Sequence, residues 1–267
     1  MAYLTVNFFS DSLRREVTFN ALLPIDGSNK LDFASQQPLK SLYLLNGFTG
    51  SHNDWISYTR IRKLSDQHNI AVFMPAGENH FYVDHEAREE YYGQFVGEEL
   101  VEFTRQCFPI STSREHTFIG GLSMGGYGAI RNGLKYNTRF AGIIALSAAL
   151  IPYKIANASP DFTHNSMRQP YFQSVFGDLT KLLGSDKDPE ALIKQLAAAG
   201  KQLPHMYLSC GTEDFLYDVN LRYHQFLLSE AIEHTYKEKP GDHTWEFWDE
   251  GIEDALNWIS ALPSTKE

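Results

Sequence analysis

The feature that most constrains this chain is a serine enclosed by glycines, in the stretch GLSMG at residues 121–125. The apolar residues 117–119 before it predict the end of a buried strand, and residues 129–136 after it predict a helix. A strand that turns directly into a helix strains the residue at the corner, and nearby glycines remove side chains that would clash there. Ser123 is therefore expected to project from a strand end as a nucleophile. The alternative is a glycine-rich packing turn without chemistry.

Short apolar runs alternate with segments of helical periodicity along most of the chain. This alternation predicts βαβ units and a mostly parallel sheet flanked by helices, an α/β architecture. An N-terminal hairpin is expected from residues 3–9 and 16–23. We expect further strands at 42–45, 70–74, 116–120, 140–146, 206–210 and 235–238, and helices at 54–64, 86–107, 129–136, 220–231 and 252–262.

The chain of 267 residues suits a single domain over residues 1–267. Residues 24–38 read as a polar loop. Residues 151–203 interrupt the regular rhythm with a long, partly helical insertion, most helical near 189–199. An excursion of this kind over the strand ends is expected to act as a lid or pocket wall, and the alternative is a surface elaboration away from the site.

The net charge of −10 argues against nucleic-acid binding and gives no support to binding at anionic membranes. The N-terminus shows no signal-peptide pattern and no stretch is long and apolar enough to span a bilayer, so we expect a cytoplasmic protein. Cys107 and Cys210 are expected to be buried free thiols. His52, His80 and His85 lack a metal-ligand spacing, so no metal or other cofactor is expected.

A serine nucleophile needs a base, and in α/β folds of this kind the base follows the serine and the acid in the chain. His243 is the preferred base, because it follows a predicted strand end in a glycine turn and precedes the last helix. His205 and His234 fall at strand beginnings and His224 falls inside a helix. His164, in the insertion, remains a weaker candidate.

The acid that orients the base should follow the preceding strand. Asp214 has the shortest reach from that strand end, and Glu213 and Asp218 are the competitors. The developing oxyanion also needs preorganised donors. We expect the backbone N–H of Met124, just after the serine, and that of Phe48, in the glycine-rich loop after residues 42–45.

These segments together carry a family resemblance that covers nearly the whole chain. They are LYLLNG at 42–47 with NDW at 53–55, GLSMGGYGA at 121–129, CGTEDFLY at 210–217 and GDHTWEFW at 241–248. The chain resembles the esterase D-like "putative esterase" family, and is most similar to its bacterial tributyrin and acetyl esterases. One departure is Asn46-Gly47, where the family commonly has His-Gly; an Asn side chain can still orient the loop by hydrogen bonding.

The resemblance implies an α/β-hydrolase fold with Ser123, Asp214 and His243 as a catalytic triad. It implies a serine carboxylesterase that hydrolyses short-chain acyl esters, such as acetyl or butyryl esters, through an acyl-serine intermediate. The alternatives are an S-formylglutathione thioester hydrolase, an acyltransferase, and a non-catalytic binding protein of the same fold. The natural ester and the oligomeric state stay open, a homo-oligomer included.

Four aromatic residues lie close in sequence to the catalytic loops, and we expect them to line the substrate pocket. They are Trp55, Tyr82, Tyr127 and Tyr217.

Overall fold

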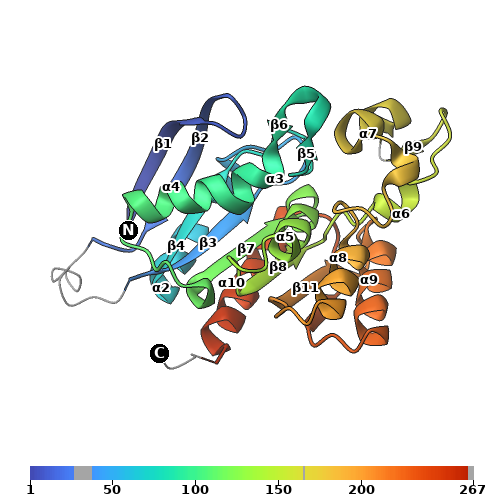
Figure 1. The fold of residues 1–267 in the computed structure, drawn as a ribbon. Helices are drawn as coiled ribbons and strands as arrows, with labels where there is room; N and C mark the ends of the chain where they lie inside the picture. Colours follow the sequence, from blue (N-terminus) through green and yellow to red (C-terminus); the bar gives the residue numbers. More distant parts are fainter. Residues whose placement is uncertain (27–37, 165, 264–267) are drawn as a thin grey trace.

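A computed structural model describes residues 1–26, 38–164 and 166–263. Most of the polar loop expected at 24–38 lies outside the described residues. The centre is an eight-stranded sheet with the order β1-β2-β4-β3-β7-β8-β11-β12 (Figure 1). Its strands are β1 (Ala2–Ser10), β2 (Arg15–Leu23), β3 (Lys40–Leu45), β4 (Ile70–Pro75), β7 (Thr117–Leu122), β8 (Gly142–Leu146), β11 (His205–Gly211) and β12 (Thr235–Lys239).

Six of these strands, from β4 to β12 in the sheet order, run parallel. The predicted hairpin of β1 and β2 is confirmed, and it joins the sheet through an antiparallel pairing of β2 with β4. Every residue of β4, β7 and β8 is buried. Strands that are covered on both faces must be apolar on both, which is why they read as continuous apolar runs. The predicted mostly parallel sheet is confirmed.

Helices cover both faces of the sheet, and each face has its own apolar core (Figure 1). One layer is formed by α1 (Asp54–Tyr58), α2 (Ile61–His68) and α10 (Trp245–Ala261). The other contains α3 (Tyr92–Gln94), the π-helical segment η2 (Phe95–Glu99), α4 (Leu100–Cys107), α5 (Met124–Lys135), α8 (Pro189–Ala198) and α9 (Tyr217–Ser229). No helix within the described ranges is both long and apolar enough to cross a membrane.

Two predicted helices differ from those in the structure. The helix expected at 54–64 breaks at Thr59, whose extended backbone ends α1 and whose hydroxyl accepts a hydrogen bond from the Ile61 amide at 3.2 Å as α2 begins. The helix expected at 86–107 starts only at Tyr92. Before it lie the short strands β5 (Asp84–His85) and β6 (Glu90–Tyr91) around the turn η1 (Glu86–Arg88), because this charged stretch has no apolar face to bury.

The two cysteines differ in their surroundings. Cys210 is buried in β11, as expected, but Cys107 is exposed and the prediction of burial is wrong. Cys107 is the last residue of α4, and both it and the preceding Gln106 are exposed at this helix end.

The insertion at 151–203 consists mainly of short helices and strands joined by loops. They are α6 (Pro152–Ile155), β9 (Thr163–His164), β10 (Met167–Arg168), α7 (Gln169–Phe176), η4 (Leu179–Lys181) and α8; a further short turn, η3 (Arg114–His116), precedes β7. In Figure 1, α6, α7 and β9 lie together at one end of the molecule.

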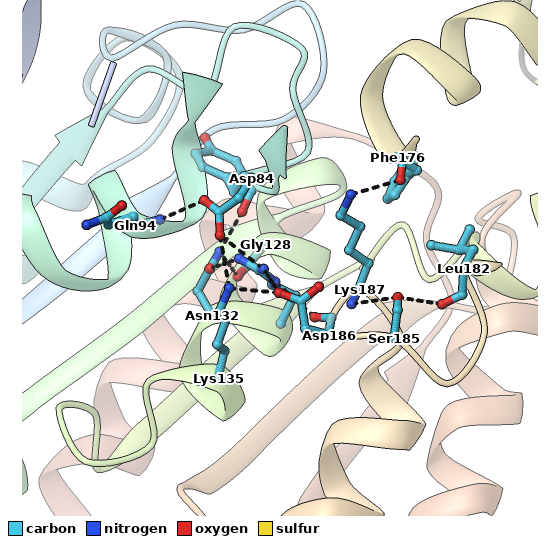
Figure 2. Close-up of polar contacts among 12 residues, drawn as sticks. Asp84, Gln94, Gly128, Asn132, Lys135, Phe176, Leu182, Ser185, Asp186 and Lys187 are labelled. Atoms are coloured by element: carbon cyan, nitrogen blue, oxygen red, sulfur yellow. Dashed lines mark hydrogen bonds and ion pairs between the residues drawn. The ribbon is translucent and has the colours of Figure 1, made fainter. Parts of the chain in front are cut away.

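An ion-pair network ties this insertion to α5, the helix behind Ser123. Arg131 is fully buried and pairs with Asp84 of β5 at 3.3 Å and with Asp186 of the insertion. Lys135 reaches the same two carboxylates, at 3.0 and 2.7 Å. Figure 2 shows the Lys135 side chain reaching the carboxylates of both Asp84 and Asp186 at this junction. Because the two cations lie between the two carboxylates, three distant parts of the chain are held together.

Candidate active site

Ser123 occupies the corner between β7 and α5, and only 9% of its surface is exposed. Its backbone has φ 53° and ψ −118°, a conformation that L-residues rarely adopt. A Cβ on Gly121 would lie 2.5 Å from the Gly125 carbonyl group, and a Cβ on Gly125 would lie 2.5 Å from the Leu45 carbonyl oxygen. Both glycines are therefore required for the serine to stand at this corner.

The structure brings Ser123 together with His243 and Asp214. His243 lies in the loop between β12 and α10, and its Nε2 is 3.0 Å from Ser123 Oγ. Its Nδ1 is 2.8 Å from Oδ2 of Asp214, which follows β11. Since the parallel strands β7, β11 and β12 end at one edge of the sheet, their loops meet there. The three groups form the continuous Ser-His-Asp chain that acyl transfer requires.

The carboxylate of Asp214 is held in its ionised form. Burial acts to raise its pKa, but hydrogen bonds from His243, the Leu216 amide and the Ser147 hydroxyl outweigh burial and lower the pKa. An ionised carboxylate can only accept hydrogen bonds, so His243 must present Nδ1–H to Asp214. Nε2 is then free to accept the proton of Ser123.

The competing candidates lie elsewhere. Glu213 hydrogen-bonds the Gly241 amide and braces the loop before His243, and Asp218 is an exposed residue of α9. His224 and His234 pair with each other, with Nδ1 and Nε2 2.7 Å apart. His205 begins β11 and His164 ends β9, so neither follows a strand of the central sheet into the site.

The two expected oxyanion donors flank the serine. Phe48 follows β3 and Met124 is the first residue of α5. Within the described part of the chain, no hydrogen bond uses either backbone N–H. Two uncommitted amides beside a nucleophile are what a developing oxyanion needs.

Asn46 organises the loop that carries Phe48. It is 1% exposed, and its Nδ2 donates to the Gly47 carbonyl at 2.8 Å. Its Oδ1 accepts from the Gly77 amide at 3.1 Å and from the Tyr82 hydroxyl at 2.9 Å. The Asn side chain thus donates within its own loop and accepts from the loop that carries Gly77 and Tyr82, as expected for a residue that fixes loop position.

A cleft of about 460 Å³ opens beside Ser123 and His243. Trp245 and Tyr58 form one wall, with ring centroids 4.9 Å apart, and Trp248 packs edge-on against His243 at 4.7 Å. The described residues that line the cleft are Gly47, Phe48, Thr49, Gly50, Asp54, Tyr58, Leu122, Ser123, His243, Trp245 and Trp248.

The four aromatic residues expected in the pocket are not among these lining residues. Trp55 is buried beneath Trp245, and its Nε1 donates to the Leu45 carbonyl at 3.0 Å. Tyr82 is buried against Asn46, Tyr127 donates to the Lys187 carbonyl, and Tyr217 donates to Glu238. Closeness in sequence to a catalytic loop was a poor guide, because these rings point into the cores or toward other loops.

The aromatic residues that do line the cleft were missed for an identifiable reason. α10 begins at Trp245 rather than at residue 252, so Trp245 and Trp248 lie one turn apart at its N-terminus. A helix start recognised at Thr244, whose side chain caps the Phe247 amide, would have put both rings in the first turn of a helix that begins directly after His243.

Ser147 was also missed. It is buried after β8 with φ 46°, accepts a hydrogen bond from Trp248 Nε1 at 3.1 Å, and contacts Asp214. Across the described ranges, no group of three or more His, Cys, Asp or Glu side chains is arranged to hold a metal ion.

The sequence and the fold are similar to those of known proteins. The family model described as "Putative esterase" matches residues 10–259. The chain is 49% identical to an acetyl esterase of Caldicellulosiruptor saccharolyticus over 265 residues, which is 98% of this chain and 99% of that one. Among solved structures, it is similar to the substrate-bound fluorophosphonate-binding serine hydrolase FphF of Staphylococcus aureus, with 30% identity, 97% and 98% coverage and a TM-score of 0.86.

The chain is also similar to the S-formylglutathione hydrolase FrmB of Staphylococcus aureus, with 29% identity and a TM-score of 0.84. The match covers 97% of this chain and 98% of that one. The fold is therefore that of the α/β-hydrolases, and the predicted serine esterase is confirmed at the level of the family. The chain belongs to the "Putative esterase" family of serine hydrolases.

Proposed function

We propose that this esterase hydrolyses short-chain carboxylic esters, acetyl esters above all, through an acyl intermediate on Ser123. The observation that carries the proposal is the Ser123–His243–Asp214 chain, with contacts of 3.0 and 2.8 Å, at the base of an aromatic cleft. The preference for acetyl groups is supported by the 49% identical acetyl esterase.

Ser123 Oγ attacks the ester carbonyl carbon while His243 Nε2 takes the hydroxyl proton. Asp214 accepts the hydrogen bond from Nδ1–H and stabilises the charged imidazole. The tetrahedral oxyanion accepts hydrogen bonds from the Phe48 and Met124 amides. His243 then gives its proton to the leaving alcohol. A water molecule attacks the acyl-serine by the same route, which releases the acid and restores Ser123.

The second candidate is hydrolysis of S-formylglutathione, which the similarity to the Staphylococcus aureus FrmB hydrolase favours. The same three residues would serve, with a thiolate in place of the alkoxide as leaving group. The two candidates differ in what the leaving-group side of the cleft must accept.

We further propose that residues 1–267 form one domain and that the insertion supports one wall of the cleft. Tyr171 of α7 packs edge-on against Phe48 with ring centroids 5.7 Å apart, and Phe48 lines the cleft. This contact between the insertion and a residue of the cleft supports the proposal.

The test is hydrolysis of p-nitrophenyl acetate by the wild type and by Ser123→Ala. We expect the variant to lose at least about 10⁴-fold in kcat, because removing the nucleophile removes the covalent route. Its unfolding transition should remain cooperative. Turnover at the wild-type rate would refute the nucleophile assignment. Comparing acetate, butyrate and octanoate esters with S-formylglutathione then ranks the two candidates.

A further inference from the structure

We propose that Asp54 sets the charge selectivity of the cleft. The favoured leaving group is an alcohol that carries a hydrogen-bond donor and no negative charge, and anionic leaving groups such as glutathione are disfavoured. This inference rests on the proposed esterase activity and adds to it the chemical class of the leaving group. It assigns a role to a cleft residue outside the Ser-His-Asp chain.

Asp54 is the first residue of α1 and lines the same cleft as Ser123 and His243. Its Oδ1 accepts a hydrogen bond from Ser51 Oγ at 3.1 Å. Its Oδ2 takes part in no hydrogen bond or ion pair within the described part of the chain. Gly50 lines the cleft next to it, and a Cβ at that position would collide with Oδ2. Because Oδ2 lies where that Cβ would be, the glycine gives the carboxylate room at this position, and the unpartnered Oδ2 of the half-buried Asp54 can accept a hydrogen bond from a substrate.

No cationic side chain balances this carboxylate at the cleft. Among the described residues that line it, none is Lys or Arg. Arg60, at the end of the loop after α1, is already paired with Asp249 at 2.6 Å and Glu253 at 2.8 Å. Burial lowers the pKa of His52, which keeps that neighbour neutral at pH 7.

The aromatic part of the cleft wall adds to this selectivity. The rings of Tyr58 and Trp245 pack against each other and add apolar surface to the cleft, which suits neutral groups and does not replace the water that solvates an anion. The chain as a whole carries a net charge of −10, so approach of an anion is also opposed at longer range. A hydroxyl or amine hydrogen on the leaving group, by contrast, can donate to Asp54 Oδ2.

The experiment uses acetyl esters with the same acyl group and three leaving groups. They are 2-acetoxyethanol, which has a free hydroxyl donor, 2-methoxyethyl acetate, which is neutral without a donor, and acetoxyacetate, which is anionic. The wild type, Asp54→Asn and Glu246→Gln are compared by kcat/KM at neutral pH and low salt. Asparagine keeps the shape and the acceptor for Ser51. Glu246 is an exposed residue of α10 that does not line the cleft, so its variant removes one charge nearby without changing the wall.

We expect the wild type to favour 2-acetoxyethanol, then 2-methoxyethyl acetate, then acetoxyacetate. Two unit charges about 8 Å apart in a partly hydrated site interact enough to change kcat/KM by about fivefold to tenfold. Asp54→Asn should raise kcat/KM for acetoxyacetate by that factor and leave 2-methoxyethyl acetate within about twofold. Glu246→Gln should change all three esters by less than about twofold, since exposed charges are screened.

Two results would overturn the inference. One is an Asp54→Asn variant whose preference between acetoxyacetate and 2-methoxyethyl acetate equals that of the wild type. The other is an equal gain for acetoxyacetate in Glu246→Gln. If the wild type hydrolyses neither these esters nor p-nitrophenyl acetate, it is the proposed function that fails, so the two failures are distinguishable.

Discussion

Asn46 offers the sharpest test of how the oxyanion loop is held. Asn46→Ala removes the donor to the Gly47 carbonyl and the acceptor used by the Gly77 amide and the Tyr82 hydroxyl. Tyr82→Phe is the graded variant, because it removes one hydroxyl from the same network and keeps the ring in place. Neither variant touches the Ser123 side chain or its base.

The magnitude follows from these contacts. Three buried hydrogen bonds of about 1 kcal/mol each are lost in Asn46→Ala, so the free energy of unfolding should fall by about 3 kcal/mol. Losing an oxyanion donor outright costs about 3 kcal/mol in the transition state. Asn46 acts on the Phe48 donor only through the loop, so we expect a smaller loss, about 10-fold to 100-fold in kcat. For Tyr82→Phe we expect about 1 kcal/mol in stability and less than about fivefold in kcat.

The assay is p-nitrophenyl acetate hydrolysis with kcat and KM determined separately, alongside urea unfolding. A donor that acts on the oxyanion stabilises the transition state alone, so KM should change by less than about twofold while kcat falls. A folded Asn46→Ala variant with wild-type kcat would refute the role of Asn46 in organising the hole. A rise in KM at unchanged kcat would show instead that the loop serves only to bind substrate.

Two other predictions concern buried polar groups. Ser147→Ala removes the hydroxyl between Trp248 and Asp214. We expect kcat for p-nitrophenyl acetate to fall about 10-fold at unchanged KM. A change confined to KM would contradict a positioning role for Ser147. Arg131→Met leaves the carboxylates of Asp84 and Asp186 with Lys135 alone, and should lower the free energy of unfolding at pH 7 by about 3 kcal/mol in urea titrations. Burial acts to raise the pKa of the Asp84 and Asp186 carboxyls, but Arg131 and Lys135 outweigh burial and lower it. The ion pairs therefore stabilise the fold fully above the ordinary carboxyl pKa, and this stabilisation is lost as the pH falls through the lowered pKa values. The deficit of Arg131→Met should therefore shrink toward pH 3, and a deficit independent of pH would argue against the ion pairs.

Much of the fold follows from local sequence patterns. Continuous apolar runs marked the central strands because strands covered on both faces have no polar side to show. The helix breaks at Thr59 and before Tyr92 were missed. The limits are set by the hydrogen bond to the Thr59 side chain in one place and by the pairing of β5 with β6 in the other, and helical periodicity reports neither.

In the site too, some features could be predicted from the sequence and others could not. Ser123, Asp214 and His243 could be predicted because chain order and strand ends limit where such groups can lie, and the structure brings the three together. The cleft aromatics could not be predicted in the same way. Trp55 precedes Tyr58 by nearly one turn of α1, yet Trp55 is buried and Tyr58 is 60% exposed. Which ring faces the cleft depends on how α1 packs against α10, and that is a tertiary contact.

The two sets of residues to which we assign roles, those that carry the chemistry and those that select the substrate, occupy different parts of the structure. Asn46, Ser147 and Asp214 are buried side chains held by hydrogen bonds to neighbouring loops, so they are fixed before substrate arrives. Part of the cleft wall comes from the two ends of α1 and the first turn of α10, where Asp54, Tyr58 and Trp245 keep contact with solvent. Preorganised groups act on the transition state, whereas wall groups contact the leaving group before and during reaction. Substitutions in the buried set should therefore lower kcat equally for every acetyl ester, while substitutions in the wall should change the ranking among esters.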